Sequence, residues 1–181
     1  MRKKILVITG SPREDGNSFA MTDAFIETAA ANGHTVVRFD AAEKNVGGCR
    51  ACGKCFENGK PCAFEDDFNA LVPEIESADA LVFTMPLYWF SFPAQIKALL
   101  DHFHSFSSSE KGVSGKECGL IVCCEDKDID GMDGIVKPYE SMARYLKWTP
   151  VGTVLVLGVL DPGDIHKTDG IARARELAGR F

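Results

Sequence analysis

The sequence predicts an α/β protein, a doubly wound five-stranded parallel sheet with helices on both faces. Five short runs rich in β-branched residues alternate with five stretches of helical periodicity along the 181 residues. Three of the runs are almost continuously apolar, as parallel strands covered on both faces require. The length suits one domain, which we expect to span residues 1–181 with a cysteine-rich loop at 46–65.

The expected strands follow one another at even intervals. They are the runs KKILVIT at 3–9, HTVVRFD at 34–40, ADALVFT at 78–84, GLIVCC at 119–124 and VGTVLVL at 151–157. The first, third and fifth are the continuous apolar runs. Connections of this length between parallel strands are right-handed crossovers, which place helices on both sides of the sheet.

The expected helices lie between these runs and are bounded by local signals. They are Ser18–Ala31, Asp67–Ser77, Pro93–Phe106, Met132–Lys147 and Thr168–Phe181. Gly33 is a typical stop after the first helix, and Asp66 or Asp67 can cap the second. Pro73 inside the second helix is expected to kink or split it, whereas Pro93 suits a first turn.

The net charge of −6 disfavours nucleic acid and anionic membrane surfaces as partners. The longest apolar stretch, Val151–Leu160, has about half the length that spans a bilayer. No targeting segment is recognisable, so we expect a soluble cytoplasmic protein without a membrane partner. In a reducing compartment its seven cysteines are thiols or metal ligands rather than disulfides.

The loop GSPREDGNS, at 10–18, follows the first strand and precedes the first helix. It lacks the glycines of a dinucleotide fingerprint, and Asn17 stands where a P-loop has lysine. A phosphate monoester suits it better, because Ser11, Asn17 and Ser18 can donate hydrogen bonds, Arg13 supplies charge, and helix N–H groups point outward. An ordinary turn with an Asn or Ser N-cap explains the isolated string equally well.

The loop after the third strand, MPLYWFSFP, has four aromatic residues in the five positions 88–92. Loop aromatics beside a phosphate cradle favour a flat π-system as ligand, while a hydrophobic lid or dimer patch is the alternative. The loop after the fourth strand, CCEDKDIDGMDG, is mostly a solvated acidic turn, but Cys124 and Glu125 stand at the sheet edge. Doubly wound proteins with the strand order 2-1-3-4-5 bind FMN at their switch point, and in that order these loops would surround it.

With GSPRxxGNS and MPLYWFSFPAQIKALLD, the chain resembles the NAD(P)H-dependent FMN reductases of the flavodoxin-like superfamily from Lys3 to about Gly158. The resemblance implies that FMN binds to these loops and passes electrons from NAD(P)H to a quinone, flavin or iron–sulfur acceptor. The implied phosphate ligands are Ser11, Arg13, Asn17 and Ser18. The implied neighbours of the ribityl chain and ring are Pro86, Leu87, Tyr88, Trp89, Phe90, Ser91, Cys124 and Glu125.

No catalytic side chain is expected, because the cofactor performs this chemistry. The resemblance also implies a small-molecule or redox-protein acceptor and a homodimer or homotetramer. A flavodoxin-type or iron–sulfur flavoprotein carrier without NAD(P)H activity is the alternative function.

A second motif, C-x2-C-x2-C-x6-C, lies in the cysteine-rich loop and is similar to that of the iron–sulfur flavoproteins. The resemblance implies a [4Fe–4S] cluster on Cys49, Cys52, Cys55 and Cys62. Structural zinc and unmetallated thiols remain open, since zinc accepts the same ligands.

Other conspicuous residues have structural explanations. We expect Cys118 and Cys123 to be buried in a strand and Trp148 to lie in the core or an interface. His102 and His104 are expected at the surface near a helix end.

Overall fold

The computed structural model describes residues 1–107 and 113–181, and its centre is a five-stranded parallel sheet of order β2-β1-β3-β4-β5. The predicted fold class and strand order are therefore confirmed. The strands are β1 (Lys4–Thr9), β2 (Thr35–Asp40), β3 (Ala80–Pro86), β4 (Glu117–Cys123) and β5 (Thr149–Val156). Each lies within two residues of its predicted start.

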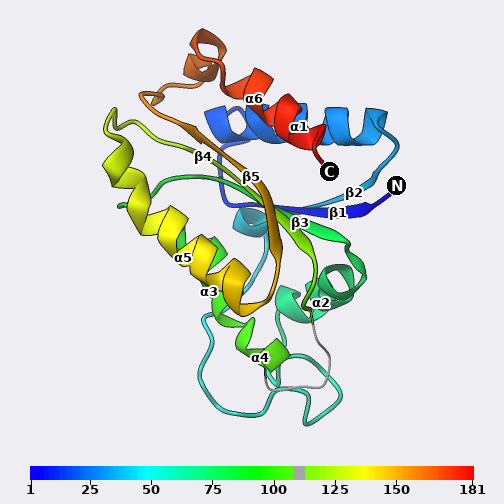
Figure 1. Ribbon diagram of the computed structural model, residues 1–181. Coiled ribbons are helices and arrows are strands. Elements are labelled where there is room, and N and C mark those ends of the chain that lie inside the picture. Colours follow the sequence, from blue (N-terminus) through cyan, green and yellow to red (C-terminus); the bar gives the residue numbers. More distant parts are fainter. Residues whose placement is uncertain (108–112) are drawn as a thin grey trace.

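Helices cover both faces of the sheet (Figure 1). They are α1 (Asn17–Ala31), α2 (Asp67–Ser77), α3 (Ala94–Asp101), α4 (His104–Ser107), α5 (Asp133–Tyr145) and α6 (Gly170–Ala178). Three short 3-10 helices lie between them: η1 (Ala41–Glu43), η2 (Ile129–Met132) and η3 (Asp164–Lys167). The helices α1 and α6 pack on one face, and α2 to α5 lie on the other.

The sheet separates two apolar layers, because successive side chains of a strand point to opposite faces. Ile5 and Val7 of β1 pack with α1 and α6, whereas Leu6 and Ile8 pack with the helices of the other face. All four side chains are fully buried. This two-sided burial is the reason that the first strand is a continuous apolar run rather than an alternating one.

Two helix boundaries agree with the local signals in the sequence. Gly33 adopts φ = 90° and donates its N–H to Ala30 at 2.9 Å, which ends α1. The Asp66 carboxylate accepts a 3.0 Å hydrogen bond from the Phe68 N–H and caps α2.

Other boundaries differ from the local expectations. Of the kink or split expected at Pro73, the split does not occur, because α2 runs through this residue. The N-cap of α1 is Gly16 rather than an Asn or Ser. The helix expected at Pro93–Phe106 is two helices, because the chain turns between α3 and α4. In that turn His102 is buried, where it stacks on Phe68 and lies 2.7 Å from the Gly47 carbonyl.

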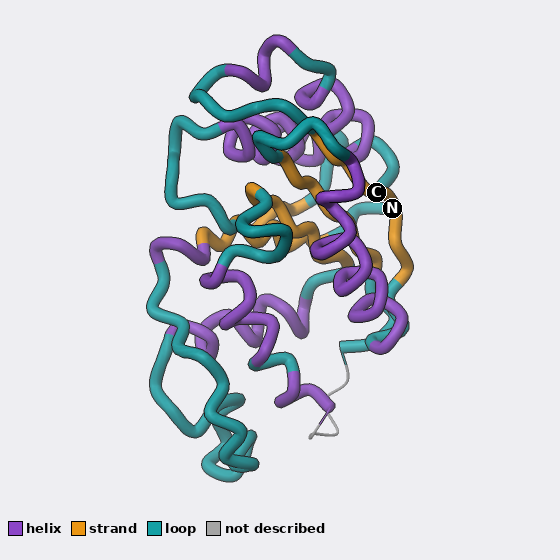
Figure 2. The backbone as a smooth tube through the Cα atoms, turned by 90° about the vertical axis from the view of Figure 1, so that its left-hand side faces the viewer, coloured by secondary structure: helices purple, strands orange, loops and turns teal. Residues whose placement is uncertain are grey.

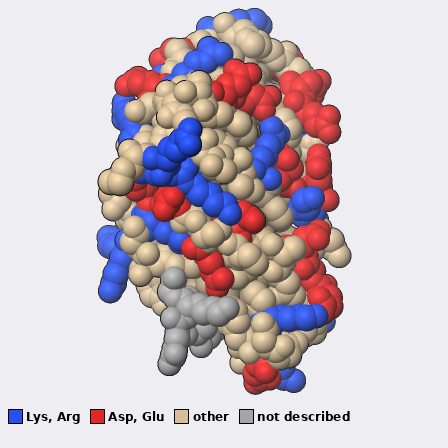
Figure 3. Space-filling view, turned by 90° about the vertical axis from the view of Figure 1, so that its right-hand side faces the viewer, with Lys and Arg blue, Asp and Glu red and all other residues tan. Residues whose placement is uncertain are grey.

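Charges of both signs are interspersed on the face that carries the amino ends of the strands (Figure 3). Near these ends, Lys3 pairs with Glu117 and Lys4 with Glu74, each at 2.6 Å. Within the described ranges, no helix combines the length and apolar composition of a membrane span.

The loops that follow β1, β3, β4 and β5 meet at the carboxyl edge of the sheet, seen edge-on in Figure 2. Gly10 continues β1 by donating its N–H to the Thr84 carbonyl at 2.9 Å. The Leu87 N–H likewise bonds the Cys123 carbonyl at 2.8 Å, and the Cys124 N–H bonds the Val156 carbonyl at 3.0 Å. The first residue of the loops after β1, β3 and β4 is thus held by the neighbouring strand.

A methyl group at Gly10 should displace α3 from the loop after β1. An ideal Cβ there lies 2.6 Å from Ile96 Cγ1 and 3.1 Å from Met85 Cβ. We expect Gly10→Ala to lower the free energy of unfolding by about 1–3 kcal/mol, the usual cost of overpacking. Gly48→Ala is the control, because its Cβ meets nothing within 4 Å. Equal urea midpoints for both variants would contradict the packing argument.

Candidate functional site

A cavity of about 220 Å³ lies where four strand-end loops meet. Its walls come from the loops after β1, β3, β4 and β5, so each wall belongs to a different β-α unit. The lining residues are Ser11, Arg13, Gly16, Asn17, Ser18, Pro86, Leu87, Tyr88, Cys123, Cys124, Glu125, Val159, Leu160 and Pro162.

The loop after β1 is held in shape by its own hydrogen bonds. The Ser11 hydroxyl accepts a 3.1 Å bond from the Arg13 N–H, and the Gly16 N–H bonds the Arg13 carbonyl at 3.1 Å. From outside the loop, Gln95 of α3 donates to the Gly10 carbonyl at 2.5 Å. The loop is therefore preorganised around the start of α1.

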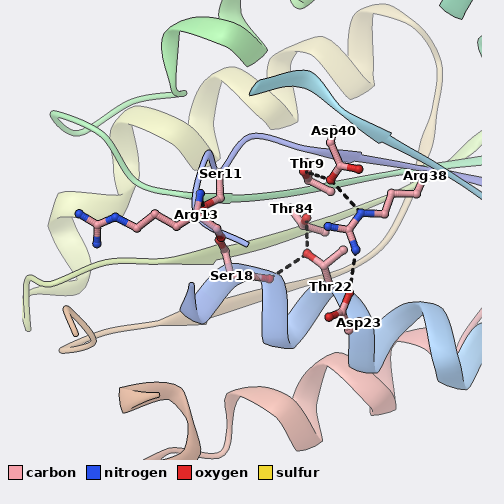
Figure 4. Close-up of polar contacts among 9 residues, drawn as sticks. All are labelled: Thr9, Ser11, Arg13, Ser18, Thr22, Asp23, Arg38, Asp40 and Thr84. Carbon is pink, nitrogen blue, oxygen red and sulfur yellow. Dashed lines mark hydrogen bonds and ion pairs between the residues drawn. The ribbon is translucent and has the colours of Figure 1, made fainter. Parts of the chain in front are cut away.

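The amino end of α1 opens into this cavity. Its N-cap is Gly16, which has no side chain with which to cap the helix, and the next residues Asn17 and Ser18 are buried. The N–H groups and dipole of the first turn thus favour an anion there. Arg13 is exposed and extends away from the buried residues of the loop (Figure 4), so its guanidinium can reach an anion from the solvent side.

The hydroxyl groups beneath the loop pair with one another rather than with the cavity. Thr22 Oγ1 lies 2.6 Å from Thr84 Oγ1 and donates to the Ser18 carbonyl at 2.8 Å (Figure 4). Thr9 donates to Asp40 at 2.8 Å, and Arg38 bonds the same carboxylate oxygen. These bonds join α1 to β3 and β1 to β2 below the site.

Asn17 ties the loop after β5 to the start of α1. Its amide nitrogen donates to the Asp161 carbonyl at 3.0 Å, and its amide oxygen accepts from the Ile165 N–H at 3.0 Å. This clamp places Val159, Leu160 and Pro162 in the cavity wall. Sequence reasoning missed these three residues, because nothing in their composition marks a ligand loop.

The aromatic turn, residues 88–91, lies at the mouth of the cavity. Tyr88 and Ser91 exchange two backbone hydrogen bonds of 3.1 and 3.0 Å, and between them Trp89 and Phe90 adopt φ values of 45° and 62°. This left-handed conformation normally selects Gly or Asn. Trp89 is 94% exposed, so its ring packs against very little. Packing of this ring therefore does not compensate for the backbone strain at Trp89.

Gly134, near the start of α5, allows the aromatic turn to sit against that helix. An ideal Cβ at Gly134 lies 1.8 Å from the Phe90 carbonyl oxygen, so no other residue is compatible with this position of the turn. The glycines of the segment GMDG could have indicated a close backbone contact at this position. The contacting residue, Phe90, lies 44 residues earlier in the chain and could not be identified from the sequence.

A second hollow, of about 580 Å³, adjoins the first cavity and shares Leu87, Cys124 and Glu125 with it. Its other lining residues are Trp89, Phe90, Asp126 and Lys127. Aromatic and aliphatic side chains on one side face an acidic loop on the other. The two spaces together suit a ligand with a small anionic end and a larger planar end.

The structure brings eleven of the twelve predicted cofactor residues to these two spaces. Ser91 is the exception, since it lines neither space and instead closes the aromatic turn. Besides the loop after β5, the prediction omitted Gly16, Cys123, Asp126 and Lys127. Gly16 could have been found from the helix-start pattern.

The two cysteines in the cavity wall are poor nucleophiles. Burial, with a smaller contribution from Cys124, raises the pKa of Cys123 to about 12. Burial and then the Asp126 carboxylate also raise the pKa of Cys124. Both thiols stay protonated near neutral pH, so covalent catalysis through them is disfavoured.

A separate cavity of about 20 Å³, here called the cysteine cavity, lies in the 46–65 loop. All four predicted metal ligands line it, together with Arg50, Ala51, Gly53, Pro61, Ala63, Phe64, His102, His104 and Ser105. Burial raises the pKa of Cys55, and the nearby Cys49, Cys52 and Cys62 raise it further. Among the described residues, no three His, Cys, Asp or Glu side chains are placed to hold one metal ion.

Two polar residues, the half-buried Asn69 and the buried His102, fix the walls of the cysteine cavity. The Cys62 N–H donates to Asn69 at 2.7 Å, and the Asn69 amide donates back to the Cys62 carbonyl at 3.2 Å. His102 Nε2 lies 2.7 Å from the Gly47 carbonyl, which connects the start of the loop to the end of α3. Figure 1 places this loop beyond α4, apart from the loops of the first cavity.

Comparison with known families matches residues 3–179 to the family described as "flavodoxin-like fold". An iron–sulfur flavoprotein from Archaeoglobus fulgidus is 31% identical over 98% of this chain and 78% of its own length. One from Methanosarcina thermophila is 33% identical over 54% of this chain, and the match spans about half (51%) of that relative. An FMN-dependent NADH:quinone oxidoreductase from Bordetella parapertussis is 30% identical over 66% of this chain and 60% of the relative.

Solved structures with the same fold include an FMN-dependent NADH-azoreductase from Bacillus anthracis in complex with FMN. It superposes with a TM-score of 0.74 and 18% identity over 98% of both chains. An NAD(P)H:quinone oxidoreductase from Methanothermobacter marburgensis has a TM-score of 0.76 and 18% identity, over 98% of this chain and 95% of that one. At this identity the likeness establishes the fold alone.

Replacing Trp89 with glycine should not weaken the fold. The left-handed conformation costs a tryptophan roughly 1–2 kcal/mol, and the exposed ring buries almost nothing in return. Because glycine has more freedom in the unfolded chain, we expect Trp89→Gly to raise the free energy of unfolding by at most about 1 kcal/mol. Ser91→Gly, at an ordinary φ, should instead lower it. Urea unfolding measures both, and a clear loss for Trp89→Gly would contradict the strain.

Proposed function

The chain belongs to the flavodoxin-like fold family, and we propose that within it the protein is an FMN-dependent oxidoreductase. It would pass electrons from NAD(P)H to a small-molecule acceptor of the quinone class. The names of the Bordetella relative and of the azoreductase and quinone oxidoreductase neighbours support this activity.

One observation carries the proposal: the uncapped, buried amino end of α1 opens into a cavity that continues into an aromatic-lined hollow. The first space offers an anion the helix dipole, free N–H groups and the Arg13 guanidinium. The second offers a planar group the apolar surfaces of Leu87, Trp89 and Phe90. FMN has this combination of a phosphate at one end and a flat ring at the other.

The protein's contribution is binding and placement. Ser11 and Arg13 would hold the phosphate with the first turn of α1, while Asn17 keeps the loop after β5 against it. Pro86, Leu87 and Tyr88 line the passage between the two spaces. Bound FMN would supply the capacity to accept a hydride and release electrons singly or in pairs.

The residues around the ring-sized hollow set its polarity. Glu125 and Asp126 are exposed, and Lys127 is the one cation among the residues that line this hollow. The raised pKa values of Cys123 and Cys124 keep both thiols protonated, so neither serves as a base. We therefore propose no catalytic side chain and an acceptor without strong negative charge.

A second candidate function, an iron–sulfur flavoprotein electron carrier, is favoured by the cysteine cavity. Its four thiols lie close enough to raise the pKa of Cys55, yet no three described side chains converge on a single ion. We propose that Cys49, Cys52, Cys55 and Cys62 hold a [4Fe–4S] cluster, which would hand single electrons onward.

Anaerobic purification followed by absorption spectroscopy separates these functions. Flavin bands that bleach on addition of NADH or NADPH support the oxidoreductase. Flavin bands that bleach only with a chemical reductant support the carrier. Protein that takes up no FMN at micromolar concentration would overturn both.

Arg13→Ala should weaken FMN binding while leaving the fold intact, because Arg13 is exposed and its side chain is not part of the core. A charge-assisted bond to phosphate contributes about 1.5–3 kcal/mol, so the dissociation constant should rise roughly 10- to 150-fold. Fluorescence titration with FMN and with riboflavin gives the measurement, and riboflavin affinity should change little. Arg175→Ala on α6 is the control, and equal FMN affinity in all three proteins would contradict the loop assignment.

Cys52→Ser should prevent the cysteine cavity from holding a stable cluster, because one thiolate ligand is lost. After anaerobic reconstitution we expect about four irons and four sulfides per wild-type chain and a large loss in Cys52→Ser. Cys118→Ala, which removes a buried thiol of β4 instead, should keep its iron. FMN binding should persist in both variants, so the two cofactor assignments are tested independently.

A further inference from the structure

Ser105 is a buried polar residue that the fold itself does not use. It lies in α4, its side chain is 2% exposed, and it lines the cysteine cavity. Its hydroxyl has no hydrogen-bond partner among the residues that the structure describes. Such a group is costly to bury, so it calls for a partner.

The backbone around Ser105 leaves its hydroxyl available. The Ser105 N–H is already bonded to the His102 carbonyl at 2.9 Å. The neighbouring hydroxyl in the same helix behaves differently, since Ser107 is exposed and donates to the His104 carbonyl at 2.8 Å. The two serines of α4 are thus a matched pair, one satisfied at the surface and one unsatisfied beside the cysteines.

The walls that carry Ser105 are rigid. His102, three residues before it, is held between the Phe68 ring and the Gly47 carbonyl. On the opposite wall, the two Asn69 bonds fix the backbone of Cys62, the buried member of the four cysteines. The serine is therefore held beside the thiols by packing rather than by its own hydroxyl.

We propose that the Ser105 hydroxyl donates a hydrogen bond to a sulfur of the group held by the four cysteines and so positions and tunes that group. The proposal rests on the iron–sulfur assignment made above. Thiolate and sulfide sulfurs in a cluster are negatively charged acceptors, and donors to them are known levers on the reduction potential. Because the reduced cluster carries one more negative charge, the donor stabilises it more than the oxidised form.

The test compares wild type with Ser105→Ala, Ser105→Thr and Ser107→Ala after anaerobic reconstitution with iron and sulfide. We expect a midpoint potential of the cluster that is more negative in Ser105→Ala, since the donor is lost. Ser105→Thr keeps a hydroxyl and should restore the wild-type value, and Ser107→Ala should match wild type. The paramagnetic resonance spectrum of the reduced protein should change only in Ser105→Ala.

The free energy of unfolding gives a second readout. The effect of Ser105→Ala on it should have opposite signs in the metal-free and the cluster-loaded protein. In metal-free protein the hydroxyl is unsatisfied, so Ser105→Ala should unfold at the same or a higher urea concentration than wild type. In cluster-loaded protein the same substitution should lower the midpoint. A purely structural hydroxyl would instead destabilise both forms.

The outcomes separate the two proposals. A wild-type chain that binds no iron and sulfide would overturn the cluster assignment and the role of Ser105 together. A loaded chain whose potential and spectrum are unaltered in Ser105→Ala would leave the cluster standing and overturn the role of Ser105. Destabilisation of the metal-free variant would also overturn it, by revealing a partner within the protein.

Discussion

The site depends on one electrostatic arrangement, the buried and uncapped amino end of α1 at the carboxyl edge of the sheet. A helix start without a side-chain cap leaves N–H groups and a partial positive charge to be satisfied by a ligand. The chain supports this arrangement from several directions. Gly10 lets α3 pack closely, Gln95 holds the loop carbonyl, and Asn17 brings the loop after β5 into the wall. These contacts come from different β-α units, so the anion site is a product of the whole sheet.

The aromatic turn is the site's second constraint, and it is maintained against local preference. Trp89 and Phe90 occupy left-handed conformations that an isolated peptide of this sequence would rarely adopt. Strand β3 before the turn, the Tyr88–Ser91 hydrogen bonds within it and Gly134 against it together hold this geometry. The turn therefore presents a large apolar surface next to the polar cavity at the start of α1. A planar ligand with one polar end requires this combination of surfaces.

The cysteines divide into two chemical groups according to burial. Cys118, Cys123 and Cys124 belong to β4 or its end, where burial raises each pKa and keeps the thiols inert. Cys49 and Cys52 are exposed, and with Cys55 and the buried Cys62 they share one small cavity on an irregular loop. A loop without helix or strand hydrogen bonds can bring four thiols together at short sequence spacing, which a regular strand cannot do. The same chain therefore has structural thiols and ligand-type thiols.

The amino-acid sequence by itself determined the class of fold, the phosphate-type loop, the aromatic loop and the cysteine spacing. These features depend on local periodicity and on motifs of adjacent residues, which a single chain segment records. Tertiary structure alone decided that His102 is buried and that Val159, Leu160 and Pro162 complete the cavity. It also placed Gly134 under Phe90 and Ser105 beside the cysteines. Each of these depends on contacts between segments far apart in the chain, and local pattern carries no information about which distant segment will be the partner.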